Sequence, residues 1–220
     1  MDAIRVQDLY DLTHTAAQEM LSACEYPWQA LARIKAAVLQ IGEGLSEAEY
    51  DHPAQDVWIA KSASIAPTAS ITGPCIIGPD SEVRPGAFLR GSILVGAGCV
   101  VGNSTELKNC ILFDGVQVPH YNYVGDSILG YMAHMGAGAI TSNVKGDKKN
   151  VVVHGEADYE TGCKKFGAML GDYAEIGCNS VLNPGTIIGR DSQVYPLSSV
   201  RGVVSARSIV KGERGVFPKK

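Results

Sequence analysis

The chain repeats itself every six residues from Ile59 to about Ser205. Aliphatic residues recur at that spacing, each often followed by glycine or another small residue, at Ile59, Ile65, Ile71, Ile77, Val83, Leu89, Val95, Val101 and Leu107. An α-helix has no six-residue period, and a β-strand alternates every two residues. Three hexads close a triangular coil of about 18 residues, so the period predicts a parallel β-helix.

Composition limits the classes of partner that the chain is suited to bind. The net charge is −4 and the isoelectric point is about 5.7, so no basic surface for nucleic acid or anionic lipid is expected. We find no run of 18 apolar residues and no basic-then-apolar leader, and we expect neither a membrane span nor a signal peptide. Cys75 and Cys99 occupy small inward positions of the repeat, and no C-x-x-C pair is present. These features predict reduced thiols in a cytoplasmic protein.

The first 57 residues lack the hexad pattern and are expected to be helical. Two helical stripes of apolar residues are present, one at Leu9, Leu12, Ala16 and Met20 and the other at Leu31, Ile34, Val38 and Ile41. Pro27 separates them, and Gly42 and Gly44 end the second. We therefore divide the chain into a helical arm (1–57), a coil (58–205) and a C-terminal tail (206–220). The arm is expected to pack on the coil or on a neighbouring subunit.

The hexad pattern breaks in two places. The phase holds as far as Pro119 and then slips by one residue, so that Val124 restarts the repeat. This predicts a register change that exposes His120, Tyr121 and Tyr123. The second break is a polar loop at about 143–165, long enough to reach a neighbouring subunit. Loops of that length in compact domains are usually functional, so we expect a site near these breaks.

Six short motifs fall in order along the coil and carry a family resemblance. They are Arg84-Pro85-Gly86-Ala87, Val101-Gly102-Asn103, Glu106-Leu107-Lys108, the block from Pro119 to Asp126, the block from Gly136 to Asn143, and Pro184-Gly185. Together they resemble the acetyltransferase half of the bifunctional glucosamine-1-phosphate acetyltransferase/uridyltransferases, in the archaeal-type sugar-1-phosphate variant. The resemblance covers about Ile59 to Val200 and implies an all-β fold, a left-handed parallel β-helix with a helical arm and a long loop interrupting its coils.

The resemblance implies an acetyl-CoA-dependent N-acetyltransferase of amino-sugar 1-phosphates, glucosamine or galactosamine 1-phosphate, within UDP-N-acetylglucosamine biosynthesis. An amine must lose a proton before it attacks a thioester, and histidine is suited to accept that proton near neutral pH. By resemblance the base is His120, acting by direct transfer, and Asn143 positions the amine. The family's substrate-binding positions correspond to Arg84, Lys108, Tyr123, Lys149, Glu106 and His134. Among these, Arg84, Lys108 and Lys149 would neutralise the phosphate, and Glu106 would orient Lys108 or a sugar hydroxyl.

The same resemblance places acetyl-CoA at Ala137, Cys178 and Pro196. Fixed backbone N–H groups at coil corners are suited to stabilise the oxyanion that forms during attack on the thioester. The family implies a homotrimer with sites between parallel coils and no metal ligand. Nothing in the arm resembles the family's nucleotidyltransferase domain, so no uridyltransferase activity is expected. His134 stands where the better-known bacterial members have an asparagine, which leaves the identity of the sugar open.

Other classes of protein remain open from the sequence. A non-catalytic scaffold or regulatory subunit that lost its nucleotidyltransferase half would show the same hexads. A related acyltransferase could act on another amine or on a hydroxyl. A zinc carbonic anhydrase on this fold needs two histidines five residues apart, and His14, His52, His120, His134 and His154 include no such pair. Cys178 as a covalent nucleophile has no base paired with it in the sequence.

Overall fold

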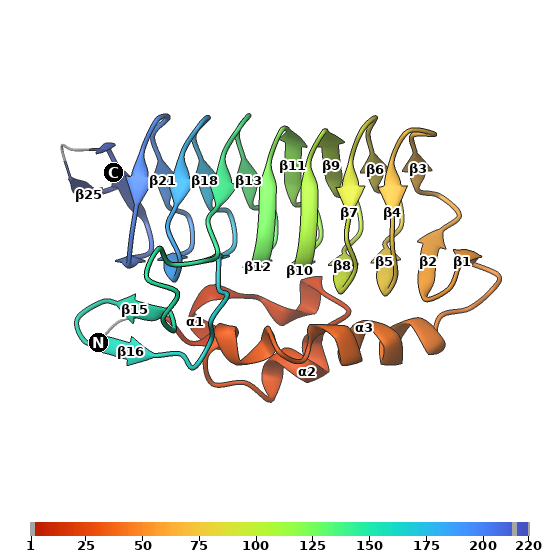
Figure 1. Ribbon diagram of the computed structural model, residues 1–220, viewed down its shortest axis with the longest axis horizontal. Helices are drawn as coiled ribbons and strands as arrows, with labels where there is room; N and C mark the ends of the chain where they lie inside the picture. The colour runs from red at the N-terminus through yellow and green to blue at the C-terminus, as the bar shows by residue number, and fades with distance from the viewer. Residues whose placement is uncertain (1–2, 213–214, 220) are drawn as a thin grey trace.

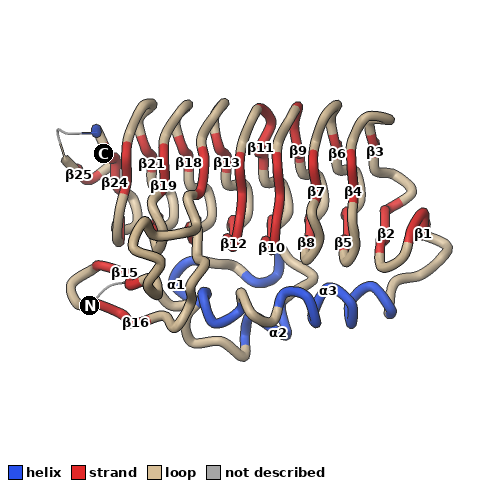
Figure 2. The backbone as a smooth tube through the Cα atoms, in the orientation of Figure 1, coloured by secondary structure: helices blue, strands red, loops and turns tan. Residues whose placement is uncertain are grey.

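The chain forms a left-handed parallel β-helix with a helical arm lying along one side (Figure 1), and the predicted fold class is confirmed. The computed structural model describes residues 3–212 and 215–219. Residues 1 and 2 of the predicted arm, and 213, 214 and 220 of the predicted tail, lie outside the described residues. Successive short strands stack into flat faces joined by corners, which Figure 2 shows as red segments linked by tan turns.

Each coil contributes strands to three faces, which we call the arm face, the groove face and the polar face, the last after the polar side-chain cluster at its edge with the arm face. The arm face contains β2 (Val57–Ala60), β5 (Cys75–Ile77), β8 (Ile93–Val95), β17 (Ala168–Leu170), β20 (Thr186–Ile188) and β23 (Val203–Val204). The groove face contains β3 (Ser64–Ile65), β6 (Glu82–Val83), β9 (Val100–Asn103), β11 (Gln117–His120), β13 (His134–Met135), β18 (Glu175–Ile176), β21 (Gln193–Val194) and β24 (Ser208–Val210). The polar face contains β4 (Ser70–Ile71), β7 (Phe88–Leu89), β14 (Ile140–Thr141), β19 (Val181–Leu182) and β22 (Ser199–Val200). Two longer strands, β10 (Glu106–Leu112) and β12 (Tyr123–Leu129), run from the polar face into the arm face.

The core of the coil consists of stacked aliphatic side chains. The hexad positions from Ile77 to Leu107 point inward, and each is at most 1% exposed. Cys75 and Cys99 are also fully buried, as their inward positions predict. Burial of apolar area at about 25 cal/mol per Å² is the main favourable term in such a core. The inward phase of the repeat is therefore confirmed over these coils.

The register slip occurs at Asn109, not at 119–123 as the hexad count predicts. Leu89 pairs with Leu107, 18 positions later, whereas Ile93 pairs with Cys110, only 17 positions later. The coil therefore loses one residue at the corner between these pairs, and the next coil keeps the shorter corner. As a result, Val118 rather than Pro119 is the partner of Val101.

The predicted first helix of the arm is divided into short pieces. The helical elements are α1 (Val6–Leu9), the 3₁₀ turn η1 (Leu12–His14), α2 (Gln18–Ser22), the 3₁₀ turn η2 (Pro27–Ala30) and α3 (Ile34–Glu43). Tyr10 is extended between α1 and η1, and the Asp11 N–H donates to the buried Asp172 carboxylate at 2.7 Å. This tertiary contact, together with the Asp11 cap on Thr13, ends the first helix early. The second predicted stripe forms α3, with Ile34 and Val38 buried.

The arm packs on its own coil and covers the arm face (Figure 1). Helix α3 lies against β5, β8 and β10, and β1 (Tyr50–Ala54) pairs antiparallel with β2. The Tyr10 ring lies 5.1 Å from that of Phe113. Because the arm occupies this face, the groove face and the polar face are the two long sides that remain uncovered by it.

The long loop folds back on the arm of the same chain. It carries a small antiparallel hairpin, β15 (Val152–His154) and β16 (Asp158–Glu160). The ring of Tyr159 lies 6.0 Å from that of Tyr26, and the ring of Phe166 lies 6.1 Å from that of Trp28. The loop is therefore anchored to the arm at its hairpin and at its return to the coil.

The coil continues past residue 205 at its far end. Strand β24 pairs in parallel with β21, and β25 (Val216–Pro218) then pairs antiparallel with β24. The division of the chain into three segments remains a prediction. Within residues 3–212 and 215–219, no helix is long and apolar enough to cross a membrane.

Candidate functional site

One corner of the coil aligns residues that lie far apart in the sequence. This corner column, between the groove face and the polar face, contains Asn103, His120, Ala137, Cys178 and Pro196. Asn103 pairs with His120 in register. The next three steps are defined by backbone hydrogen bonds: Gly138 N–H donates to the His120 carbonyl at 3.0 Å, Asn179 N–H to the Ala137 carbonyl at 2.8 Å, and Leu197 N–H to the Cys178 carbonyl at 2.9 Å.

The column places the predicted base next to the predicted acetyl-CoA positions. Neighbouring strands in a sheet lie about 4.8 Å apart, so Ala137 is one coil from His120, and Cys178 and Pro196 are two and three coils away. His120, Cys178 and Pro196 are exposed and Ala137 is half-buried, so a ligand can reach the column from outside.

Buried Asn122 supports the turn that presents His120. The Asn122 side-chain amide donates to the carbonyls of Gly136 and Ala139 at 2.8 and 3.0 Å, and its oxygen accepts from the His120 N–H at 3.1 Å. Tyr121, between the two, has a φ of 51°, in the left-handed region. The imidazole of His120 has no hydrogen-bond partner among the described residues, so its ring nitrogens are available to a ligand.

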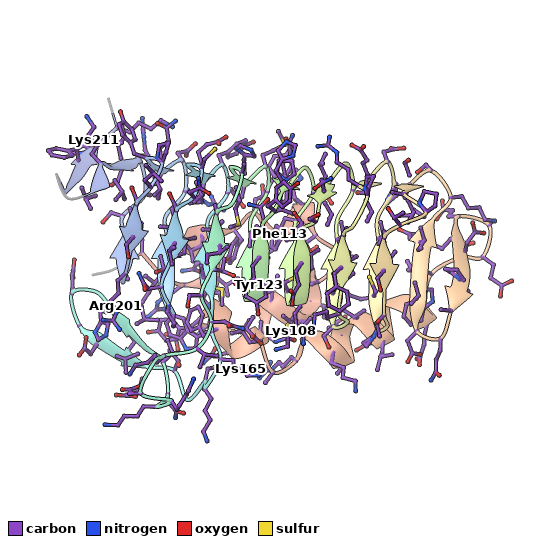
Figure 3. The ribbon with its side chains drawn as sticks, turned by 45° about the horizontal axis from the view of Figure 1, so that its top comes forward. Lys108, Phe113, Tyr123, Lys165, Arg201 and Lys211 are labelled. Carbon is purple, nitrogen blue, oxygen red and sulfur yellow. The ribbon has the colours of Figure 1, made fainter. Side chains whose placement is uncertain are left out.

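A polar cluster on the neighbouring corner is centred on Asp126. This Asp126 cluster contains Asp126, Lys108, Asn109, Asn143 and Tyr123. The Asp126 side chain is only 7% exposed and accepts from Lys108 Nζ at 3.4 Å, from Asn109 Nδ2 at 2.9 Å and from Asn143 Nδ2 at 2.6 Å. Asn143 Nδ2 also lies 3.1 Å from the Tyr123 phenol oxygen. Figure 3 shows Lys108 and Tyr123 on neighbouring strands β10 and β12.

The electrostatics of the cluster keep the Tyr123 phenol protonated. Burial raises the pKa of Tyr123 above its usual 10, and the charges of Asp126 and Glu106 raise it further. A neutral phenol retains its hydrogen and can donate it to an anion. The Lys108 side chain is about a quarter exposed, and its ammonium pairs with Asp126.

Three other predicted substrate-binding residues make no hydrogen bond or ion pair with the Asp126 cluster among the described residues. They are Glu106, Arg84 and Lys149. Glu106 accepts from Arg90 at 2.6 Å, and its predicted role in orienting Lys108 or a sugar hydroxyl stays a prediction. Arg84 pairs with Glu82 at 3.0 Å, at the end of β6. In register it lies two coils below Pro119, the residue before His120. Lys149 is exposed in the long loop, and no contact joins its ammonium to the Asp126 cluster among the described residues.

His134 lies on the groove face rather than in the Asp126 cluster. Its Nδ1 is 2.8 Å from Glu175 Oε2, on the next strand of that face. The two residues line a shallow groove of about 230 Å³ whose wall also includes Cys178 and Pro196. The groove therefore runs beside the predicted acetyl-CoA positions of the corner column.

Sequence reasoning missed two members of the Asp126 cluster. Asp126 belongs to the Val124-Gly125-Asp126 motif, but its role as the common acceptor depends on the corner geometry. Asn109 gave no motif signal, and only the one-residue deletion at its corner, visible as the slip in the repeat, could have pointed to it. No group of three or more metal-binding side chains is present within the described part of the chain.

Comparison with known proteins places the coil in a family. The family model described as GMPPB C-terminal domain matches residues 71–206. The chain belongs to this family. Its match covers the corner column and the Asp126 cluster in full.

Curated relatives confirm the resemblance drawn from the motifs. The bifunctional protein GlmU of Methanococcus maripaludis (strain C5) is 36% identical over 137 residues, which is 62% of this chain and 33% of the relative. The bifunctional sugar-1-phosphate nucleotidylyltransferase/acetyltransferase of Sulfurisphaera tokodaii is 33% identical over 137 residues, 62% of this chain and 31% of the relative. The aligned segment thus spans about a third of these relatives' length.

Solved structures with some likeness include two N-acyltransferases. A point mutant of perosamine N-acetyltransferase from Caulobacter crescentus is 17% identical, covers 70% of this chain and 52% of its own, and has a TM-score of 0.34. A point mutant of AntD, an N-acyltransferase from Bacillus cereus, is 16% identical, covers 70% and 74%, and has a TM-score of 0.41. Scores this low do not establish a common arrangement, and the fold assignment follows from the strand pairing described above.

Proposed function

We propose that this protein is an acetyl-CoA-dependent N-acetyltransferase whose acceptor is an amino-sugar 1-phosphate. The observation that carries the proposal is the corner column, which aligns an exposed histidine with Ala137, Cys178 and Pro196 in consecutive coils. The family of the coil and the acetyltransferase relatives support the reaction class. The Asp126 cluster, on the other edge of the polar face, supplies the groups that an anionic amine substrate needs.

His120 acts as the general base in this proposal. The amine nitrogen attacks the thioester carbonyl carbon, a C–N bond forms, and the amine proton passes to the imidazole. The tetrahedral intermediate then collapses, the C–S bond breaks, and the thiolate leaves and takes up a proton to give the free thiol. The imidazole is suited to this role because it is exposed and has no competing partner among the described side chains.

The acetyl donor lies along the corner column and the adjoining groove. The column extends over about 14 Å, three coil spacings, from His120 to Pro196. An extended thioester chain laid along it would place its carbonyl near Ala137, where backbone N–H groups at the corner are fixed by the coil. His134 and Glu175 line the groove beside that path, which favours a role near the donor rather than at the sugar.

The phosphate of the acceptor would be held by cations on the polar face and below the column. Lys108 and the neutral Tyr123 phenol present donors in the Asp126 cluster, and Asn143 orients the amine. Arg84 lies at the column side, about 10 Å, two coil spacings, below the level of His120. Lys149, exposed in the long loop, would supply a further cation for the phosphate.

We further propose a cytoplasmic homotrimer with each site between two coils. Because the arm covers the arm face, a neighbouring coil would have to dock on the groove face or the polar face, which meet at the corner column. Light scattering would then give a mass of three times 23.3 kDa at micromolar concentration. A stable monomer would remove the shared site from the proposal.

The test of the reaction class is thiol release from acetyl-CoA. Glucosamine 1-phosphate, galactosamine 1-phosphate and the corresponding unphosphorylated amino sugars would be compared as acceptors, with N-acetylglucosamine 1-phosphate as a control that has no free amine. We expect release with one or both amino-sugar phosphates and none with the control. No release by folded protein with any acceptor would favour the scaffold interpretation instead.

A further inference from the structure

The side chain of Asn109 links the arm to the Asp126 cluster. Asn109 Nδ2 donates to the carbonyl of Leu31, in the arm, at 3.2 Å and to Asp126 Oδ1 at 2.9 Å. Its two amide hydrogens can therefore serve the arm and the cluster at once. The position of this one amide thus depends on the arm as well as on the coil.

The shortened corner is what makes this bridge possible. In the coil below, Arg90, Gly91 and Ser92 connect the polar face to the arm face. In the coil that contains Asn109, only Lys108 and Asn109 make that connection. Asn109 has a φ of 46°, in the left-handed region that asparagine tolerates better than most residues. Asp126, in the next coil, occupies the same position at a φ of 49°. The two side chains are therefore stacked at one corner, with the arm on one side and Lys108 on the other.

Asp126 in turn controls the groups that the proposed acceptor would meet. Its second oxygen, Oδ2, accepts from both Lys108 and Asn143. A buried carboxylate needs several donors to remain charged at low cost, and here Asn109 provides one of three. Loss of the Asn109 donor would leave Oδ1 without its partner and free the carboxylate to turn, which would displace Lys108 and Asn143.

We propose that Asn109 and Asp126 are positioning residues and that the N-terminal arm is thereby a working part of the acceptor site. The arm holds Asn109 through Leu31, Asn109 fixes the Asp126 carboxylate, and Asp126 holds Lys108 and Asn143 in place. The kinetic part of this inference rests on the proposed function; the positioning of Lys108 does not.

The variant that tests the bridge is Asn109→Gly. Glycine accepts the positive φ without strain, so the change removes the amide and leaves the backbone free to keep its path. Ser92→Gly is the matched control, because Ser92 occupies the same corner one coil below at a φ of 55° and makes no side-chain hydrogen bond among the described residues. Thermal melts of both variants would report any general loss of stability.

Two measurements separate this inference from the proposed function. The first is the rate of acylation of Lys108 by acetic anhydride, followed by mass spectrometry, with exposed Lys149 as the internal reference. We expect Lys108 to react several times faster in Asn109→Gly than in wild type and Ser92→Gly. Equal rates in the three folded proteins would overturn the inference, whether or not the protein is an acetyltransferase.

The second measurement is steady-state kinetics with an accepted amino-sugar phosphate. Loss of a charge-assisted contact predicts a KM for the amine about tenfold higher in Asn109→Gly, with the KM for acetyl-CoA unchanged. Ser92→Gly should match wild type. An Asn109→Gly variant with unchanged KM for the amine, in an active enzyme, would also overturn the inference. Absence of thiol release by wild type would count against the proposed function alone, and the labelling result would still decide the positioning role.

Discussion

The side-chain amide of Asn143 donates to the phenol oxygen of Tyr123 at 3.1 Å, across 20 positions of sequence. Because the phenol oxygen accepts this bond, the phenol's own hydrogen remains available for a ligand. The long loop leaves the coil at Asn143. This contact therefore joins the loop to β12, the strand that begins at Tyr123 and passes through the shortened corner. The proposed acceptor site depends on this junction.

Tyr123→Phe should weaken acceptor binding without disturbing the coil. The ring remains, but the donor that we assign to the phosphate and the oxygen that accepts from Asn143 are both lost, and the KM for the amine should rise by about tenfold. Since the pKa of Tyr123 is raised above 10 by burial and by Asp126, its phenol stays protonated up to at least pH 9. The KM ratio of variant to wild type should therefore be constant between pH 7 and 9. A ratio that falls toward one at pH 9 would contradict the assigned donor.

Ala137→Leu should obstruct the acetyl donor and spare the acceptor. Ala137 is half-buried in the corner column, one coil from His120, and a larger side chain there would occupy the proposed path of the thioester. The KM for acetyl-CoA should rise at least tenfold while the KM for the amine stays within twofold. Isothermal titration with coenzyme A would check the same point without turnover, and unaltered affinity would remove Ala137 from the donor site.

The thiols should differ sharply in reactivity. Burial raises the pKa of Cys75 and of Cys99 to about 12. At pH 8 such thiols are ionised to about one part in ten thousand, and the fraction rises tenfold with each pH unit until the pKa is reached. Cys178 is exposed and should react with iodoacetamide in the folded protein. Peptide mapping at pH 8 should show Cys178 modified first, with Cys75 and Cys99 modified only after unfolding.

Val101→Asp should prevent stable folding, because Val101 is fully buried inside the coil. The desolvation penalty of a buried charge is several kcal/mol even after relaxation, against a typical total stability of about 5–15 kcal/mol. Val100→Asp is the matched control, since Val100 is the preceding residue and points to the opposite side of the same strand. Soluble expression and a melting temperature near wild type are expected only for the control.

The hexad repeat predicts the coil well because each inward position requires an aliphatic or small side chain. The repeat predicts the wrong position for the register slip, and the reason is physical. Leu112 and Phe113 are both fully buried, so hydrophobicity alone does not show which one continues the inward series. The count therefore runs on through Phe113, and the missing corner residue near Asn109 appears about ten residues late, around Pro119.

The candidate site is likewise only partly predictable from the sequence. His120, Ala137, Cys178 and Pro196 could be selected from motif resemblance, and a coil of near-constant length aligns them. Asp126 as a common acceptor, the pairing of Glu106 with Arg90 and the bridge from Asn109 to the arm depend on side chains meeting across a corner. The breaks in the first arm helix likewise depend on Asp172, which is 161 positions from Asp11.

The central claim is that His120 removes the proton from the attacking amine. The measurement that tests it most directly is kcat for thiol release with an accepted amino-sugar phosphate in wild type and His120→Ala, at saturating acetyl-CoA. Loss of a general base typically lowers the rate by about 10²–10⁴, and the exposed imidazole contributes no side-chain hydrogen bond within the described residues, so the melting temperature should be unchanged. We expect kcat to fall by that factor while coenzyme A affinity is retained. Equal kcat values in the two folded proteins would contradict the account.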